Sequence, residues 1–493
     1  MRCAFDPQLR LDCPVVPEVR LNTDCRDEII PILRALQHIY SRPELRDELL
    51  DAVARDVNAT TRADPGRPGM DYWSILVLGA VRLGCDLNYD RLQNLAEEHR
   101  SLRRIMGIDG WCDDQTFDWR GLRDNIGLLS PDTIERLNPL IVAEGHRLVP
   151  EAAEAVRGDS FVVATDVHYP TDSSLIGDGL RTIVPTAKRL AGLLGRGGWR
   201  QHKHWLGTVG KQLRVINRIA ASKGRDYRKR LQDSYRALLH TADRILARAT
   251  GLLDPAWFPI SPGPATRTIE RLRTKLLDFV DMTIQACDQA RRRVIAEESV
   301  PNDAKLFSLF EPQTQLIKRG KVPQPVEFGH RVLVIEDGAG FVCHYAILPR
   351  GAEDCDVLVE QIRQVQRRLG GRIRSASFDR GFHSPENQRA LADLVSQPCL
   401  PVKGHVQAER QERAATVQFR RARRRHAGVE SAIGALQSGN GLERCRDRSF
   451  GGDGRYVGLG MLGRNLHVLG KLLIAHADPK SVAGRSRRGR EAA

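Results

Sequence analysis

The sequence predicts an α/β protein in which a mixed sheet is flanked by helices, preceded by an all-α region and interrupted by a helical insertion. The run Phe161–Val163 has the composition of a buried strand, and Pro170 stops it because proline donates no ladder hydrogen bond. Strand patterns return only later, first at Lys305–Glu311 and then at Val326–Glu336, Phe341–Leu348 and Arg372–Phe378, and long helical patterns fill the interval. One sheet built from such distant segments must contain an insertion.

Helical patterns also dominate the first 150 residues. Apolar residues recur at helical spacings in Asp27–Tyr40, and Pro43 opens a second helix. The apolar run Y-W-S-I-L-V-L-G-A-V-R-L-G predicts a buried helix, and Asn88–Met106 predicts a charged amphipathic one. This group of helices, with basic exposed positions, is compatible with a helix-turn-helix module, and a plain packing bundle fits the pattern equally well.

Shorter elements are expected in the second half of the chain. Lys305–Glu311 and Cys399–Val402 resemble short strands, and Asp356–Leu369 resembles a helix. Ser384 is placed to cap a helix that has proline in its first turn. A long arginine-rich helix is expected over about 412–437.

The charge balance favours a polyanionic partner. Lys and Arg total 76 against 61 Asp and Glu, which gives a formal net charge of +15. The ten cysteines form no C-x-x-C pair and no zinc spacing, so we expect reduced thiols. No apolar run is long enough to span a bilayer, and the first residues lack the apolar stretch of a signal peptide, so an intracellular protein is expected.

Three acidic residues are candidates for catalysis. Asp166 follows the first predicted strand, Asp379 ends a later one in S-F-D-R-G-F-H, and Glu430 lies on the predicted arginine-rich helix. Taken singly, a strand-end Asp more often bonds its own turn, and a helical Glu more often faces solvent. Two strands that deliver carboxylates to one end of a sheet, beside a helix that offers a third, make a shared site the stronger hypothesis.

Such a site suits phosphodiester chemistry with metal ions. Two hard divalent cations can stabilise charge on both the attacking and the leaving oxygen of a phosphodiester. Mg²⁺ prefers oxygen ligands and keeps some of its waters, so a few carboxylates suit it. In this hypothesis Asp166 bridges two ions, and Asp379 and Glu430 each complete one site.

Other polar candidates have structural explanations. Asp172 is expected to cap the helix that follows Pro170. Glu336 and Asp337 are adjacent at a predicted hairpin, where turn chemistry accounts for them better than metal binding does. The segment 451–454 (G-G-D-G) lacks the Lys-Ser/Thr of a phosphate-binding loop and is expected to be a flexible loop.

Several stretches resemble insertion-sequence transposases of the DDE class, whose catalytic domain is RNase H-like (retroviral-integrase-like), and within them the ISNCY group. The matching stretches span most of the region from about 160 to 470; they are Thr165–Leu175, Pro325–His330, Phe378–Asn387, Arg423–Ile433 and Arg464–Leu466. The resemblance implies an RNase H-like domain made of 151–175 and 301–475. It further implies a DNA-end-binding region at 1–150, a helical insertion at 176–300 and a basic tail at 476–493.

The resemblance also implies residue roles. Asp166, Asp379 and Glu430 would form the catalytic, metal-binding triad, with two Mg²⁺ or Mn²⁺ ions as cofactors. Related families carry a Tyr, Arg, Glu, Lys pattern on the helix with the glutamate, and here Arg423, His426 and Gln437 replace the Tyr, Arg and Lys. The expected DNA-binding residues on this helix are therefore Arg423, Arg424, Arg425 and His426.

The function so implied is a DNA transposase that binds the terminal inverted repeats of its element, hydrolyses a phosphodiester and transfers the strand. Two alternatives stay open: a nuclease of the same fold without strand transfer, and a non-catalytic DNA-binding derivative. The expected partners are double-stranded DNA, as transposon ends and target, and further copies of the chain, with no membrane. The expected location is the cytoplasm of a prokaryote, associated with the nucleoid.

Overall fold

The computed structural model describes residues 12–60, 69–112, 114–222, 224, 226–258, 265–318, 326–402 and 416–477. These divide into two compact units, one made of 1–166 with 330–493 and the other of 167–329. Each unit has its own cluster of buried apolar side chains. No described helix has both the length and the apolar character needed to cross a membrane.

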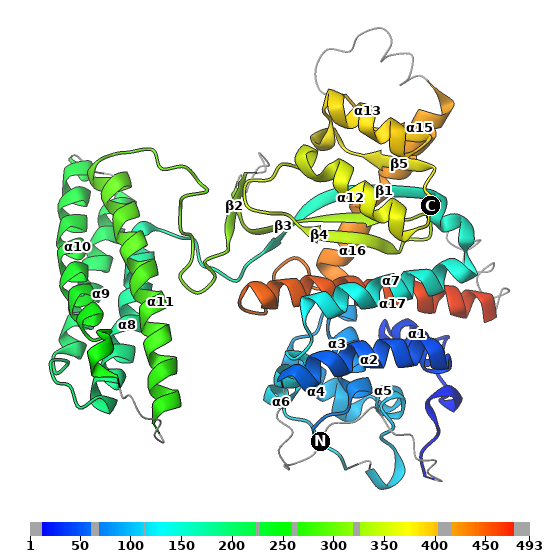
Figure 1. Cartoon of the computed structure of the whole chain (residues 1–493), viewed down its shortest axis with the longest axis horizontal. Coiled ribbons are helices and arrows are strands. Elements are labelled where there is room, and N and C mark those ends of the chain that lie inside the picture. The colour runs from blue at the N-terminus through cyan, green and yellow to red at the C-terminus, as the bar shows by residue number, and fades with distance from the viewer. Residues whose placement is uncertain are drawn as a thin grey trace. The chain divides into compact units, whose positions relative to one another are not determined.

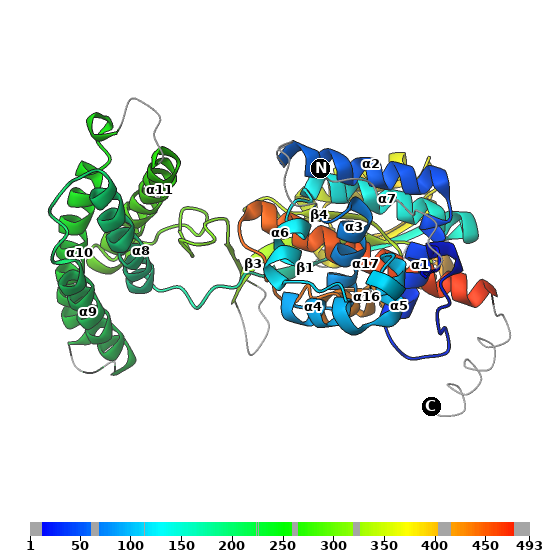
Figure 2. The same cartoon turned by 90° about the horizontal axis from the view of Figure 1, so that it is seen from below.

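The first unit begins with helices that pack around one long C-terminal helix. The long helix is α17 (Phe450–Ala477), and it lies against α1, α3 and α7 (Figures 1 and 2). The N-terminal helices are α1 (Ile29–Tyr40), α2 (Pro43–Thr60), α3 (Tyr72–Gly84), α4 (Tyr89–Glu98), α5 (Arg100–Ile105), α6 (Trp119–Ile126) and α7 (Pro131–Leu148). Because α3 is buried along its whole length, it is the centre of this layer.

A mixed sheet forms the rest of the first unit. Its edge strand β2 is made of residues that belong to the second unit. The order is β2-β3-β1-β5-β6, and β4 pairs with β3. Strands β1, β5 and β6 are parallel, whereas β3 and β4 form the predicted antiparallel hairpin. The strands are β1 (Ala155–Ala164), β2 (Gln315–Lys318), β3 (Val326–Glu336), β4 (Val342–Ile347), β5 (Ser375–Phe378) and β6 (Gln397–Cys399). The predicted mixed α/β class is confirmed, and the order is consistent with an RNase H-like domain.

Four helices accompany the second half of the sheet. They are α12 (Asp354–Arg368), α13 (Pro385–Leu394), α15 (Val417–His426) and α16 (Gly428–Gly439). Ser384 caps α13 by accepting from the Asn387 N–H, as predicted. The arginine-rich segment expected as one helix is two in its described part, α15 and α16, with Ala427 between them.

The second unit consists mainly of four long helices. They are α8 (Asp172–Leu193), α9 (His202–Ser222), α10 (Tyr227–Gly251) and α11 (Thr266–Ala290). Thr171, not Asp172, caps α8; Asp172 is buried and accepts from Gln289 and Arg293. These contacts join the start of α8 to the end of α11.

Two sequence predictions about local structure are wrong. Lys305–Glu311 is not a strand, because its backbone bonds to side chains: Ser308 accepts from Glu311, and Gln289 accepts from Leu306. Residues 451–454 are not a loop but the start of α17. There Asp453 is buried and bonds to His330, a long-range contact that local glycine content could not reveal.

Candidate active site

The register of β1 and β5 determines which carboxylates meet. Gly158 is partnered with Phe378, the last residue of β5. Asp159 is the next residue of β1, and Asp379 directly follows β5; paired strands lie about 4.8 Å apart, so the two acids begin from neighbouring positions. Asp159 is half-buried and Asp379 is exposed. The register therefore leads Asp159 and Asp379 out side by side from the last recorded pair of β1 and β5.

Both side chains belong to the face of the sheet that α15 and α16 cover. Arg157 is partnered with Ser377, and its Nη1 donates to the Arg425 carbonyl at the end of α15, 2.8 Å away. Alternate residues of a strand share a face, so Asp159 projects to the same side as Arg157. Asp379 lies two residues after Ser377, so in an extended backbone it projects to the same face as Ser377.

His426 and Glu430 complete this cluster from the helix side. Burial lowers the pKa of His426, and the charge of Asp379, a hydrogen bond to the Ser377 backbone and the charge of Glu430 oppose that shift. The charges of Asp379 and Glu430 thus both act on the His426 imidazole, although the two acids are about 50 positions apart in the sequence. Glu430 is exposed in the first turn of α16. His426 therefore lies near a carboxylate that follows β5 and near one in the first turn of α16.

An ion pair between Arg157 and the buried Glu336 lies next to the junction of α15 and α16. Arg157 contacts Glu336 of β3 through Nε at 2.7 Å and Nη2 at 2.6 Å. Glu336 is 2% exposed; burial raises its pKa, and the charges of Arg157 and Arg464 oppose the rise. A Cβ at Gly428 would lie 2.1 Å from Arg157 Nη1, so a larger residue at this position would displace the guanidinium. Arg157 thereby fixes the start of the helix that carries Glu430.

Asp166 is not brought to the other acids. It lies two residues beyond the end of β1, and that end is five residues, or about 17 Å of extended strand, from Asp159. The end of β1 bonds to another segment: the Ala164 N–H donates to the Glu443 carbonyl, and the Cys445 N–H donates back. Asp166 is 73% exposed and lies 3.4 Å from Arg444, a surface pair worth at most about 1 kcal/mol.

The four predicted DNA-binding residues point in different directions. Arg423 lines a pocket at β6, whereas Arg425 lines a smaller one over β1 and β5. Arg424 is exposed on α15. His426 is half-buried beside Asp379 and has an unpaired, buried Nδ1 among the described atoms. Its position associates it with the acids more than with a phosphate surface.

A second cluster, His146, Asp337 and Cys343, is buried and close enough to suggest a cation site. Its atoms already have partners, however. Asp337 Oδ1 accepts from the N–H groups of residues 339–341, and its Oδ2 lies 2.6 Å from His146 Nε2. The Arg372 guanidinium lies 3.3 Å from the other ring nitrogen. This arrangement is a satisfied turn network, and a nearby guanidinium disfavours a metal.

Sequence reasoning missed Asp159 because its pattern pointed to the strand end. A signal was present: Asp159 interrupts a strand whose neighbours Val156, Phe161, Val162 and Val163 are buried. An acidic residue inside a buried strand is costly unless paired or functional. Only the strand register shows which residue lies opposite Asp379.

Comparison with protein families connects this geometry to a known class. Residues 302–460 match the family described as "Transposase DDE domain", a range that includes β2 to β6, the helices α12, α13, α15 and α16, and the start of α17, but not β1. The match confirms the resemblance to DDE-class transposases and supports a transposase function in general. It does not confirm the assignment to the ISNCY group. Comparisons with curated proteins and with solved structures found no match.

Proposed function

We propose that this chain, whose residues 302–460 match the transposase DDE domain, is a metal-dependent DNA transposase with Asp159, Asp379 and Glu430 as its carboxylates. The observation that carries the proposal is the register of β1 and β5, which sets Asp159 beside Asp379 under the helix pair with His426 and Glu430. In this proposal Asp159 takes the place that the motif T-D-V-H-Y-P-T-D suggested for Asp166.

The residues fit a pair of hard divalent cations. The three donors are carboxylates, and Asp379 and Glu430 are exposed, so ligand positions stay open for water and phosphate. Arg157, two positions before Asp159 on β1, forms an ion pair with Glu336. When bound, Mg²⁺ or Mn²⁺ would stabilise charge on the phosphodiester oxygens.

The protein groups have separate tasks in this scheme. Asp159, Asp379 and Glu430 would hold the cations, while Arg157 and Glu336 would position the helix junction. His426 is held neutral at pH 7 by burial, so it is suited to accept a hydrogen bond from a water or a sugar hydroxyl. The exposed Arg424 and Arg423 are available for DNA phosphates. In the proposed reaction, one strand is hydrolysed at a transposon end and its 3′-hydroxyl then attacks target DNA.

The N-terminal helices are the proposed site of end recognition. On α6, Arg120 and Arg123 lie over the half-exposed Trp119 ring, at 4.4 and 5.5 Å from its centroid. His99 caps α5 by accepting from the Leu102 N–H, which gives a helix break between α4 and α5. The basic, aromatic face of α6 favours nucleic acid over a plain packing role.

The test compares four acid variants on a plasmid that carries the gene with its flanking DNA. With Mg²⁺, Asp159→Asn, Asp379→Asn and Glu430→Gln should each lower strand cleavage by at least about a hundredfold, because each removes a charged metal ligand. Asp166→Asn should cleave at nearly the wild-type rate. All four should bind DNA as the wild type does in a chelating buffer.

The reverse pattern, with Asp166→Asn inactive and Asp159→Asn active, would contradict the assignment of the first acid. A pre-cleaved end separates the transposase from its alternatives: strand joining supports the proposal, and cleavage without joining indicates a nuclease. Absence of metal-dependent cleavage by the wild type on any DNA would indicate a non-catalytic DNA-binding protein.

A further inference from the structure

The smaller cavity over β1 and β5 has a volume of about 160 Å³ and lies on the face of the sheet that α15 covers. Alternate residues of a strand share a face, so side chains two apart on each strand point the same way. The floor of the cavity is made of two register pairs, Ala155 with Ser375 and Arg157 with Ser377. Ala422 of α15 also lines it. The space exists because small side chains stand on both the strand and the helix.

The two serine hydroxyls of this floor are buried polar groups. Ser375 is 5% exposed and Ser377 is 3% exposed. Neither hydroxyl has a hydrogen-bond partner within the described part of the chain, and both residues line the cavity. A buried hydroxyl without a partner is costly. The cavity therefore needs an occupant that accepts hydrogen bonds from its floor.

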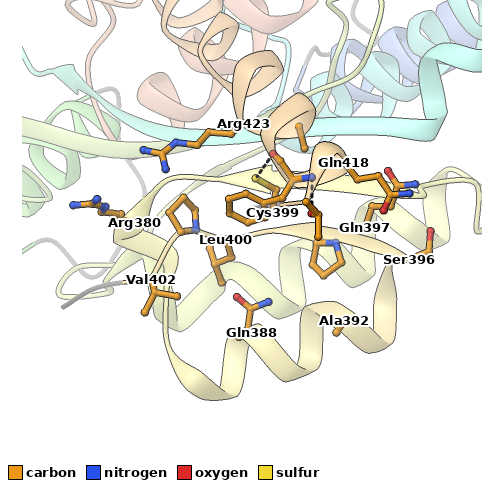
Figure 3. A pocket seen from close by; sticks show the side chains of 15 residues that line it. Arg380, Gln388, Ala392, Ser396, Gln397, Cys399, Leu400, Val402, Gln418 and Arg423 are labelled. Carbon is orange, nitrogen blue, oxygen red and sulfur yellow. Dashed lines mark hydrogen bonds between the residues drawn. The ribbon is translucent and has the colours of Figure 1, made fainter. Parts of the chain in front are cut away.

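Two guanidinium groups line the same cavity, from Arg157 and Arg425. Arg157 contacts Glu336 through Nε and Nη2 and donates one bond from Nη1, and it retains further N–H groups because each Nη carries two. Among the described residues, no carboxylate lies within ion-pair distance of Arg425. Arg423 of the same helix lies elsewhere, toward Arg380 at the cavity beside β6 (Figure 3).

The carboxylate of Asp337 also lines the cavity, but its oxygens are already bonded. Its Oδ1 accepts from the N–H groups of residues 339–341, and its Oδ2 lies 2.6 Å from His146 Nε2. The Arg372 guanidinium lies 3.3 Å from the other nitrogen of that ring. The side-chain groups left open to the cavity are therefore hydroxyl and guanidinium donors, which favour an anion over a cation.

We propose that this cavity binds a small tetrahedral oxyanion of the size of inorganic phosphate, held by the hydroxyls of Ser375 and Ser377 and by the guanidinium groups of Arg157 and Arg425. Such an ion accepts several hydrogen bonds at once, and bonds between ionised partners are the stronger ones. A bound ion would link β1 and β5 to α15, the helix that precedes the one with Glu430. The proposal does not depend on the proposed function, because its ligand is a free ion.

The test measures binding of inorganic phosphate to the full chain by equilibrium dialysis, at constant ionic strength with chloride as the reference ion. The wild type should bind one phosphate per chain with a Kd below about 1 mM. Ser377→Ala and Arg425→Gln should each weaken this binding about tenfold, because each removes a hydrogen bond to a charged ligand. Arg425 is exposed, so its variant carries the test even if Ser377→Ala fails to fold.

Arg420→Gln is the matched control. Arg420 is an exposed arginine of α15 that lies two positions before Ala422, so it projects to the opposite side of the helix from the cavity. Its removal changes the net charge by the same amount as Arg425→Gln and should leave the Kd for phosphate unchanged. Because phosphate stabilises folded proteins in general, unfolding midpoints are compared between these two variants at one phosphate concentration. Only Arg425→Gln should lose part of the rise seen in the wild type.

The outcomes also distinguish a free ion from a DNA phosphate, which offers the same chemistry. No saturable binding up to about 20 mM phosphate would overturn the site. Binding that survives both Ser377→Ala and Arg425→Gln would show an adventitious ion only, bound elsewhere. If phosphate does not bind but both variants weaken the affinity for a paired duplex, the anion belongs to DNA and the free-ion site is excluded. None of these results changes strand cleavage by the wild type, so the proposed function is tested separately.

Discussion

At the scale of single residues, the site depends on which acid shares a register with Asp379. Asp159 and Asp166 are both acids near the end of one strand pattern, and local sequence favours Asp166 because it follows the apolar run. The pairing of Gly158 with Phe378 favours Asp159. The end of β1 is five residues beyond Asp159, and five residues of extended strand measure about 17 Å, far more than two metal ions can span.

The buried pair of Arg157 and Glu336 gives a prediction about stability and activity. Arg157→Gln should lower the free energy of unfolding by about 3 kcal/mol, because it leaves Glu336 charged and buried without its main partner. It should also slow cleavage, because the contact to the Arg425 carbonyl is lost. Denaturant unfolding and the plasmid cleavage assay measure the two effects.

Arg444→Gln is the matched control, because Arg444 is a 64% exposed arginine that pairs with the exposed Asp166. It should change stability by less than about 1 kcal/mol. The double variant Arg157→Met with Glu336→Met should regain stability without regaining cleavage. Full cleavage by Arg157→Gln would show that the arginine does not position the helix junction.

His467 gives a prediction about pH. Burial lowers its pKa to about 4, and the charges of Lys471 and Arg464 add to the effect. The unfolded chain therefore binds a proton below its ordinary pKa of 6.5 while the folded chain does not. Stability should be highest above about pH 6.5 and should fall as the pH drops toward 4. His467→Leu should reduce the loss of folding stability between pH 7 and pH 5, as measured by unfolding midpoints.

His476→Gln serves as the control for that measurement, because His476 is exposed near the end of the same helix. It should leave the pH dependence unchanged. His344 and His426 also have lowered pKa values, so some pH dependence remains in every variant. An identical loss in the wild type and in His467→Leu would exclude His467 as a contributor.

At the scale of elements, helix α17 organises the N-terminal half of the first unit. Sequence reasoning expected a loop at 451–454 because glycine usually breaks a helix. In the structure, glycines of α17 allow close helix crossings: a Cβ at Gly470 would lie 1.7 Å from the Pro31 carbonyl oxygen of α1. Tertiary contact therefore overrides the weak helix propensity.

Gly470→Ala should lower stability by about 1 to 3 kcal/mol, because the added methyl group forces α1 and α17 apart. Gly451→Ala on the same helix has no atom within 4 Å of the new methyl group, so it should be neutral or slightly stabilising. Thermal unfolding compares the two variants. Equal melting temperatures would show that the crossing can relax without cost.

At the scale of the whole molecule, the chain has two separate apolar cores. The second includes Leu180, and the first includes Leu78; both side chains are fully buried. Because the cores share no residue, we expect two thermal transitions in calorimetry. Leu180→Ala and Leu78→Ala should each lower the midpoint temperature of a different transition. Each should reduce the free energy of unfolding of the affected core by about 2 to 5 kcal/mol.

A single transition that both variants lower together would show that the two units unfold cooperatively. The result also tests whether the second unit is an independent insertion, because in the sequence it separates β1 from most of the later strands of the sheet. If the second unit unfolds alone, the strands that belong to the first unit do not need the core of the second.

The sequence by itself determined the α/β class, the β3–β4 hairpin, the cap of α13 and the resemblance to DDE transposases, because these depend on local patterns and motifs. It also identified Asp379 and Glu430 as candidates, which remain proposals. Tertiary structure alone decided that Asp159 lies beside Asp379 and that residues 451–454 begin a helix. Strand register, helix crossings and buried ion pairs join residues far apart in the chain, and no local pattern encodes which partners meet.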